Sequence, residues 1–183
     1  MENNDKYIGT LLDDRYEILQ VIGEGGMAIV YKALDHRLNR NVAVKIMRED
    51  MLADEEFRSR FCAEAHAVAM LSHPNIVAVY DVSHSDAMEY IVMELVEGIT
   101  LRQYMDRRGA LAWREVLHFT KQIAKAIAHA HERGIIHRDI KPSNIIITSY
   151  NYAMLLDFNA AKQFSGQNES DTVLIGTPGY AAP

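Results

Sequence analysis

The octet His137-Arg138-Asp139-Ile140-Lys141-Pro142-Ser143-Asn144 concentrates charged and polar side chains in front of an apolar run, Ile145–Ile147. An aspartate, a lysine two residues further on and an asparagine five residues further on suit phosphoryl transfer. That chemistry needs a carboxylate to orient a hydroxyl, a cation for the migrating phosphoryl group and an oxygen ligand for Mg²⁺. For the octet alone, the alternative is a charged surface turn between a helix and a strand.

The composition bounds the class of protein. The chain has 183 residues, of which 49% are hydrophobic and 24% charged, which is ordinary for one large or two small soluble domains. A net charge of -6 gives no sign of nucleic-acid binding. A single cysteine, Cys62, excludes a disulfide framework and a cysteine-rich zinc site and suits a reducing compartment. No apolar run reaches the length of a membrane span, and the acidic start of the chain is unlike a signal peptide.

A glycine-rich stretch separates two expected strands, residues 16–22 and 29–33. Glycines there let backbone N–H groups approach phosphate oxygens without a Cβ in the way. Gly23, Gly25 and Ala28 also satisfy the dinucleotide fingerprint G-x-G-x-x-G/A, but that motif must open a helix. Because a β-branched run follows instead, the pattern predicts a hairpin and argues against a nicotinamide-dinucleotide enzyme.

A lysine and a glutamate stand on apolar stretches further along the chain. Lys45 lies within an expected strand, residues 41–47, and Glu64 falls on the apolar stripe of an expected helix, residues 54–71. Taken singly, the lysine could face water at a sheet edge and the glutamate could mark the edge of the stripe. Since a buried lysine requires an anionic partner, we expect a Lys45–Glu64 ion pair.

The remaining elements follow from periodicity and from capping residues. Strands are expected over residues 76–82 and 89–93, and a short helix capped by Thr100 is expected to run through Met105. A longer helix is expected from 112 to 131, ended by Gly134. Its apolar face is predicted to comprise Val116, Phe119, Ile123, Ile127 and Ala130, and its histidines, His118, His129 and His131, show no metal-binding pattern. After strands at 145–148 and 153–156 comes Asp157-Phe158-Asn159.

Taken in order, the glycine loop, strand lysine, helix glutamate, H-R-D, D-F-x and A-P motifs resemble those of the protein kinase family over nearly the whole chain. Lys141 and the stretch 176–180 look like serine/threonine rather than tyrosine kinases. Residues 25–28, together with 73–77, look most like the eukaryotic-like (Hanks-type) kinases of bacteria. The resemblance implies an α+β, bilobal fold. Its N-terminal lobe would be an antiparallel sheet with one long helix, and its C-terminal lobe would be mainly helical.

The resemblance also divides the chain and assigns its chemistry. Residues 1–15 would be a lead-in, 16–94 the N-terminal lobe, and 95–183 the hinge with part of the C-terminal lobe. The expected reaction moves the γ-phosphoryl group of ATP to protein Ser/Thr hydroxyls, with Asp139 and Lys141 as catalytic residues. Asn144 and Asp157 would bind Mg²⁺, with Mn²⁺ as a substitute. The expected nucleotide-binding residues are Ile22, Gly23, Glu24, Gly25, Gly26, Val30, Ala43, Lys45, Glu64, Met93, Glu94, Val96 and Ile146.

Two departures from the family pattern bear on these expectations. Asn159 replaces the glycine of D-F-G, from which we expect altered switching rather than lost metal binding. The chain stops at Pro183, before the glutamate of A-P-E, so we expect a piece of a longer kinase that is truncated after the activation segment. A nucleotide-binding but non-catalytic signalling module is therefore the alternative function.

The resemblance also sets expectations about regulation and location. Thr172, and next Ser170, are the expected phosphosites, with Arg138 receiving the phosphate. Expected partners are ATP, protein substrates and a second copy of the chain for autophosphorylation, without nucleic acid. The expected location is cytoplasmic, including the cytoplasmic part of a membrane receptor kinase.

Overall fold

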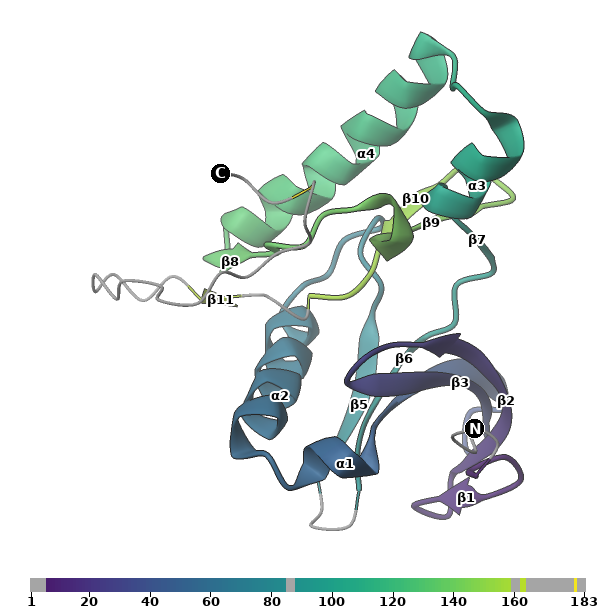
Figure 1. The fold of residues 1–183 in the computed structure, drawn as a ribbon, viewed down its shortest axis with the longest axis vertical. Helices are drawn as coiled ribbons and strands as arrows, with labels where there is room; N and C mark the ends of the chain where they lie inside the picture. Colours follow the sequence, from purple (N-terminus) through teal and green to yellow (C-terminus); the bar gives the residue numbers. More distant parts are fainter. Residues whose placement is uncertain (1–5, 85–87, 159–161, 164–179, 181–183) are drawn as a thin grey trace. The chain divides into compact units, whose positions relative to one another are not determined.

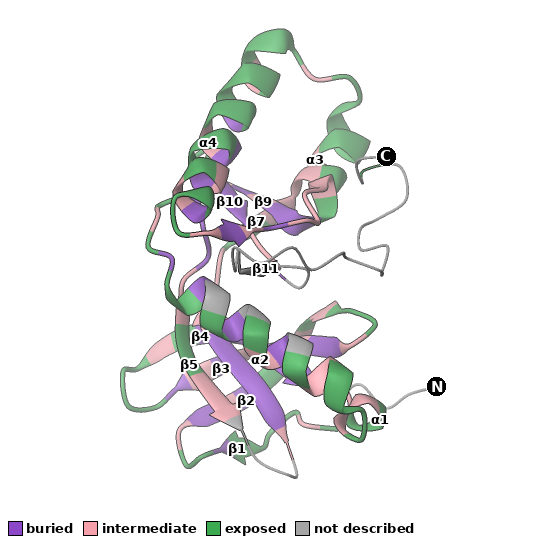
Figure 2. Ribbon diagram, turned by 90° about the vertical axis from the view of Figure 1, so that its left-hand side faces the viewer, coloured by how far each residue is buried: buried purple, intermediate pink, exposed green. Residues whose placement is uncertain are grey.

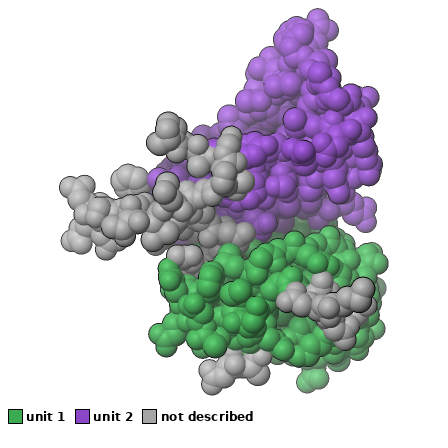
Figure 3. Space-filling view, in the orientation of Figure 1, with its two compact units in different colours: residues 1–65, 78–95 green, residues 66–77, 96–183 purple. Residues whose placement is uncertain are grey.

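The computed structural model describes residues 6–84, 88–158, 162–163 and 180. The chain forms two compact units (Figure 3). Unit 1 comprises residues 1–65 and 78–95, and unit 2 comprises residues 66–77 and 96–183. The predicted lobes, 16–94 and 95–183, differ from these units chiefly in residues 66–77. The predicted lobe boundary itself stays a prediction.

The described part of unit 1 is built on an antiparallel sheet with the strand order β1-β2-β3-β4-β6-β5 (Figure 1). Two helices, α1 and the longer α2, follow β4 in the chain. Asp54 begins α2 as predicted, because its Oδ1 accepts a hydrogen bond of 2.9 Å from the N–H of Glu56. The element bounds are β1 Leu11–Leu12, β2 Tyr16–Glu24, β3 Ala28–Asp35, β4 Arg40–Met47, α1 Glu49–Leu52, α2 Glu55–Ala69, β5 Val79–His84 and β6 Glu89–Glu94.

The two faces of this sheet are buried by different partners. Side chains alternate between the faces along each strand, which puts Tyr31, Val42 and Val44 on one face in a cluster with Tyr16 and Tyr90. The opposite face carries Met47 and Ile91, which pack with Phe61 and Ala65 of α2. Figure 2 shows α2 lying across the strands of this sheet, and its buried residues include Phe61 and Ala65.

The described part of unit 2 combines two helices with short strands. A three-stranded sheet has the order β10-β9-β7, and a second pair joins β11 to β8. Thr100 forms the predicted N-cap of α3, with a complete capping box to Gln103. Gly134, after α4, has φ +70°, the left-handed conformation expected of a glycine that ends a helix. The bounds are β7 Gly98–Thr100, α3 Leu101–Arg108, α4 Trp113–His131, β8 Ile135–Ile136, a 3₁₀ turn Pro142–Asn144, β9 Ile145–Thr148, β10 Ala153–Leu155 and β11 Lys162–Gln163.

The predicted α+β class, with an antiparallel sheet and one long helix in the N-terminal part, is confirmed. The expected lead-in contributes more than a tail, because Leu11–Leu12 pair with Tyr16–Glu17 and Leu12 is buried. The strand expected from residue 76 begins instead at Val79. Ile76 and Val77 are buried in unit 2, where the N–H of Val77 donates to the carbonyl of Leu155.

The long helix α4 confirms its predicted length but presents a partly different face. Val116 is 46% exposed, so its place on the predicted apolar face is wrong. Ile127 is only partly buried, and Ala126 takes a fully buried position instead. An alanine side chain is small enough to let neighbouring backbone approach a helix closely. A prediction from hydrophobicity alone gives too little weight to this property. The buried residues of α4 are Phe119, Ile123, Ala126 and Ala130.

Candidate active site

Unit 2 brings three polar residues of the octet, Asp139, Lys141 and Asn144, into one cluster. Lys141 Nζ lies 2.8 Å from Asp139 Oδ2, with the two side chains 24% and 14% exposed. The Asn144 amide nitrogen donates to the same carboxylate oxygen and to the Asp139 backbone carbonyl, both at 3.0 Å. The Asp139 carboxylate is therefore held by a cation and an amide donor, in a fixed orientation.

Asn144 also connects the octet to the strand that precedes Asp157. Its backbone carbonyl accepts a hydrogen bond of 2.9 Å from the N–H of Leu156, the residue directly before Asp157. Because its side-chain nitrogen is engaged by Asp139, the amide oxygen Oδ1 is the atom that can serve a cation, with Ser143 Oγ 3.5 Å away. Asn144 is thus hydrogen-bonded to the residue next to Asp157, the other predicted metal ligand.

His137 is a buried support beneath the octet. It is 2% exposed, and its ring lies 4.4 Å from the ring of Phe158, centroid to centroid. Burial lowers the pKa of His137, so the neutral ring is favoured. Its Nδ1 lies 3.3 Å from the N–H of Asp139 and accepts from it, and Nε2 lies 2.8 Å from the Leu156 carbonyl. The neutral tautomer must then carry its proton on Nε2 and donate it to Leu156.

Two residues of the predicted site have an uncommon backbone conformation. Arg138 has φ +62° and Asp157 has φ +47°, both in the left-handed region that few non-glycine residues adopt. Such conformations are concentrated at functional sites, where surrounding contacts hold them in place. The nearby Asn159 lies outside the described residues, as do Ser170 and Thr172.

The site can be tested for its fit to a metal. In the described parts of the chain, no group of three or more His, Cys, Asp or Glu side chains could hold a metal ion on its own. Asn144 and Asp157 supply oxygen atoms from two side chains. Mg²⁺ ordinarily takes one or two carboxylates and completes its shell with water and substrate phosphates. These two residues fit a nucleotide-borne Mg²⁺ better than a resident metal.

In unit 1, the strand register puts four predicted nucleotide-binding residues on one face of the sheet. Val30 is opposite Lys45, and Ala43 is opposite Met93. Ala43 and Lys45 are two residues apart in β4, so their side chains point to the same side. This is the face that packs against α2.

Lys45 is buried, at 6% exposure, as the sequence predicts. Glu64 lies in α2, but its side chain is outside the description, so the Lys45–Glu64 ion pair stays a prediction.

The glycine stretch has the predicted strand–loop–strand form, since β2 pairs with β3 from Tyr16 opposite Asp35 to Glu24 opposite Ile29. The helix required by the dinucleotide fingerprint does not follow this loop, because β3 occupies that position. Ile22 and Glu24 of β2 and the loop residues Gly25 and Gly26 are exposed. An exposed hairpin is compatible with the predicted binding of phosphate oxygens by its N–H groups.

The remaining predicted nucleotide contacts lie around the end of β6 and in β9. The Glu94 N–H donates to the carbonyl of Ala78 at 2.9 Å, so only its carbonyl can serve the predicted adenine contact while this bond lasts. Val96 and Ile146 are partly buried in unit 2. Their contact with a nucleotide stays a prediction.

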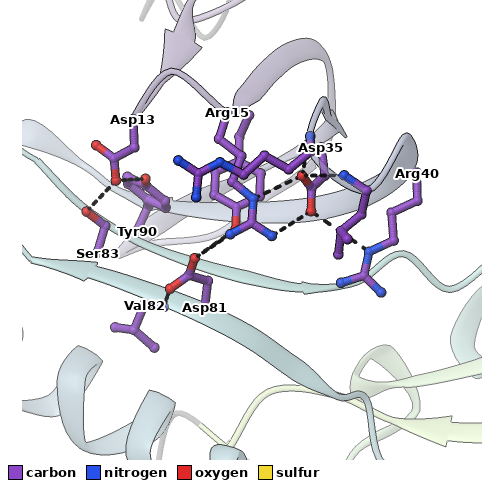
Figure 4. A network of polar contacts seen from close by, with 11 residues as sticks. Asp13, Arg15, Asp35, Arg40, Asp81, Val82, Ser83 and Tyr90 are labelled. Carbon is purple, nitrogen blue, oxygen red and sulfur yellow. Dashed lines mark hydrogen bonds and ion pairs between the residues drawn. The ribbon is translucent and has the colours of Figure 1, made fainter.

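A polar network in unit 1 was missed by the sequence reasoning (Figure 4). Asp35 is 1% exposed and accepts from Arg15 through Nε at 2.9 Å and Nη2 at 2.8 Å. The Arg15 guanidinium holds the pKa of Asp35 below its usual value. Asp81 joins the network by accepting from Arg15 at 3.3 Å and from the Tyr16 hydroxyl at 2.8 Å. Asp35 occupies a buried position in the alternating pattern of β3. This pattern was the sequence signal that could have revealed its burial.

A second buried carboxylate was also missed. Glu89, at 1% exposure, begins β6 and accepts a hydrogen bond of 2.7 Å from Arg58 Nε on α2. Cys62 Sγ lies 3.6 Å from its other oxygen, and burial raises the pKa of that thiol. These contacts anchor α2, the helix that carries Glu64, to the sheet.

Comparison with known proteins agrees with this architecture. The model of the protein kinase domain matches residues 16–183, and the chain belongs to that family. It is 46% identical over 177 residues to the serine/threonine-protein kinase PrkC of Bacillus subtilis, covering 96% of this chain and 27% of PrkC. It is 41% identical over 179 residues to the serine/threonine-protein kinase PknB of Mycolicibacterium smegmatis, covering 94% of this chain and 29% of PknB.

These relatives confirm the predicted resemblance to bacterial serine/threonine kinases. The chain spans roughly a quarter of the length of the curated relatives it matches. Among the described residues, no helix is both long and apolar enough to cross a membrane.

Proposed function

We propose that the chain carries the catalytic machinery of a serine/threonine protein kinase, which transfers the γ-phosphoryl group of ATP to protein Ser or Thr hydroxyls. The observation that carries this proposal is the cluster of Asp139, Lys141 and Asn144, with contacts of 2.8 and 3.0 Å. Phosphoryl transfer depends mainly on positioning and on electrostatic stabilisation, and this cluster supplies both.

Asp139 and Lys141 act on the substrate hydroxyl and on the phosphoryl group that moves to it. The Asp139 carboxylate orients the substrate hydroxyl and takes its proton as the hydroxyl oxygen bonds to the γ-phosphorus. The bond from that phosphorus to the β–γ bridging oxygen breaks, and ADP leaves. Lys141 Nζ, 2.8 Å from Asp139 Oδ2, is close enough to balance negative charge that develops on the migrating group. The buried ring of His137 keeps the backbone of Asp139 in place through their 3.3 Å contact.

The nucleotide side is proposed from the family pattern and the sheet register. Lys45 binds phosphates, Val30 and Ala43 contact adenine on the same sheet face, and the glycine loop approaches phosphate oxygens with its N–H groups. The further proposed contacts are Ile22, Glu64, Met93, the Glu94 carbonyl, Val96 and Ile146. Asn144 Oδ1 and the Asp157 carboxylate would hold Mg²⁺, or Mn²⁺ in its place. When bound, that ion neutralises phosphate charge.

The wider setting of the reaction is also proposed. The partners are ATP, Ser/Thr-containing protein substrates and a second copy of the chain for autophosphorylation. We propose a cytoplasmic location for the kinase domain, from the similarity to bacterial kinases and the use of ATP.

Phosphotransfer to a serine/threonine protein substrate, measured with γ-labelled ATP, tests the proposal. Asp139→Asn and Lys45→Met are each expected to abolish transfer. Asp50→Asn and Lys121→Met are matched controls, because both residues are exposed and belong to helices outside the cluster; transfer should persist in them. The rise in stability on adding Mg²⁺-ATP is measured alongside and is expected to be about 2.7 kcal/mol at about 100 times the Kd. Nucleotide binding without any transfer by the wild type would favour the non-catalytic alternative.

A further inference from the structure

The residues that join β4 to α1 contact the glycine loop. Arg48 directly follows β4, and its Nε donates to the Gly25 carbonyl at 3.0 Å. The backbone N–H of Arg48 donates to the Met27 carbonyl at 2.9 Å. The Gly25 N–H in turn donates to the Ala28 carbonyl at 2.9 Å, which closes the loop on itself. Arg48 therefore holds the loop at two carbonyls. These bonds restrict the directions in which the N–H groups of the loop can point.

The loop depends on such bonds because its own residues pack little. Glu24, Gly25 and Gly26 are exposed, and a Cβ added to Gly26 would meet nothing within 4 Å. Consecutive glycines have wide conformational freedom, and fixing them is entropically costly. A loop that binds phosphates must still present its N–H groups in one arrangement. Bonds from outside the loop reduce the number of arrangements it can adopt.

Glu49, the next residue, contacts the N-terminal segment. Its carboxylate accepts from Lys6 Nζ and, at 2.9 Å, from the Tyr7 hydroxyl. The Tyr7 ring packs edge-to-face on the fully buried ring of Tyr31, with centroids 6.1 Å apart. Tyr7 is thus anchored in the sheet core at one end and holds Glu49 at the other. The segment before β1 and the loop between β2 and β3 converge on the neighbours Arg48 and Glu49.

The ionisation of these groups favours the contact around neutral pH. Lys6, followed by Tyr7, holds the pKa of Glu49 below its usual value. Burial, followed by the Glu49 carboxylate, raises the pKa of Tyr7 to about 12. The carboxylate and the protonated phenol are therefore the forms present, and they form the donor–acceptor pair described above.

We propose that Arg48 and Glu49 are positioning residues for nucleotide phosphates, with Arg48 fixing the glycine loop and Glu49 fixing Arg48 through Lys6 and Tyr7. The inference rests on the proposed kinase function and deepens it. It has a specific consequence, since only the phosphates are predicted to contact the loop N–H groups. Loss of either residue should weaken ATP binding and spare adenosine, which lacks phosphates.

The test is calorimetric titration of the 183-residue chain with Mg²⁺-ATP and, separately, with adenosine. Loss of one hydrogen bond corresponds to about a fivefold weaker Kd, so Arg48→Met is expected to weaken Mg²⁺-ATP about fivefold. Glu49→Gln is expected to weaken it about twofold, since its effect is transmitted through Arg48. Arg48→Lys retains a donor and should restore part of the loss.

Asp50→Asn is the matched control for Glu49→Gln. Asp50 lies in the same helical turn, and in the described part of the chain it makes no hydrogen bond or ion pair, so its variant should bind both ligands as the wild type does. Adenosine affinity should stay as in the wild type in every variant, so that even the loss of about twofold expected for Glu49→Gln appears as a change in the ratio of the two Kd values. A general loss of folded protein would lower both affinities together, which separates positioning from stability.

Three results would contradict the inference. Unchanged Mg²⁺-ATP affinity in Arg48→Met, with normal binding by the wild type, would overturn the positioning role and leave the kinase proposal standing. Equal losses for ATP and adenosine would also overturn it. A wild-type chain without affinity for Mg²⁺-ATP would overturn the kinase proposal and this inference with it. If Arg48→Met does not fold, the exposed Glu49→Gln substitution decides the same question.

Discussion

Replacing the buried His137 by Phe should destabilise the fold in a pH-dependent way. Phenylalanine keeps a ring against Phe158, whose centroid lies 4.4 Å away, but it removes both ring nitrogens. The Asp139 N–H and the Leu156 carbonyl then lose hydrogen-bond partners at 3.3 and 2.8 Å. Leaving a buried polar group unpaired costs about 1–3 kcal/mol, and the Asp139 bond is long. We therefore expect His137→Phe to cost about 2–4 kcal/mol near neutral pH.

The pH dependence follows from the lowered pKa of His137. The unfolded chain binds a proton near the ordinary value of 6.5, while burial keeps the folded ring neutral to lower pH. Stability from the neutral ring is therefore present above pH 6.5 and is lost as the pH falls through that value toward the folded-state pKa. Between about pH 7.5 and about pH 5.5, this loss reaches at most ~1.4 kcal/mol. The variant His137→Phe lacks this titration, so the cost of the substitution should shrink by up to that amount.

Urea unfolding at the two pH values measures both effects. The matched control is His131→Phe, at an exposed position shortly before Gly134, which should change stability by less than about 0.5 kcal/mol. A cost below about 1 kcal/mol at neutral pH would refute the hydrogen-bonding argument. A cost that grows on acidification would mean that the carboxylates of Asp139 and Asp157 outweigh burial and keep the ring charged.

Two further predictions concern the rest of the fold. Burial raises the pKa of Tyr7 to about 12 and also raises the pKa of Tyr16 and Tyr90, so their contribution to stability should persist below about pH 10 and be lost as the pH rises above it. Tyrosinate absorbance followed together with circular dichroism checks this, and early titration of all tyrosines in the folded chain would contradict it. Gly98→Ala should cost about 1–3 kcal/mol, because its Cβ would lie 2.4 Å from the Ile147 carbonyl oxygen. Gly26→Ala is the unhindered control in urea unfolding, and equal costs would rule out steric conflict at Gly98.

Much of the fold could be predicted because its long elements have a clear hydrophobic period. Strands β2, β3 and β4 and helix α4 repeat apolar residues over eight or more positions. The short elements were missed because they show no such period. β1 has two residues and α1 has four, which is too short for any period to be visible. Ile76 and Val77 are buried without being in a strand. An apolar run in the sequence cannot distinguish a buried loop from a buried strand.

The candidate site was predictable in its residue types and less so in its contacts. The order of motifs indicated Asp139, Lys141 and Asn144, and the fold brings them together. Spacing could not reveal that the Leu156 N–H bonds the Asn144 carbonyl or that Arg48 bonds the Gly25 carbonyl, because both contacts use backbone atoms, whose geometry any residue type can supply. Asp35 and Glu89 were missed because their burial depends on arginines that reach them from other elements.

The contacts of Asn144 also restrict which residue types this position can tolerate. An aspartate there would offer the same oxygen to a cation and would look conservative from the standpoint of metal coordination. It would replace the N–H donor, now 3.0 Å from Asp139 Oδ2, by a second anionic oxygen. Two carboxylates at that separation repel one another when both are ionised. Exchange at this site is therefore limited by charge, because an amide donates to the Asp139 carboxylate and still offers an oxygen to a cation, whereas an ionised carboxylate has no hydrogen to donate.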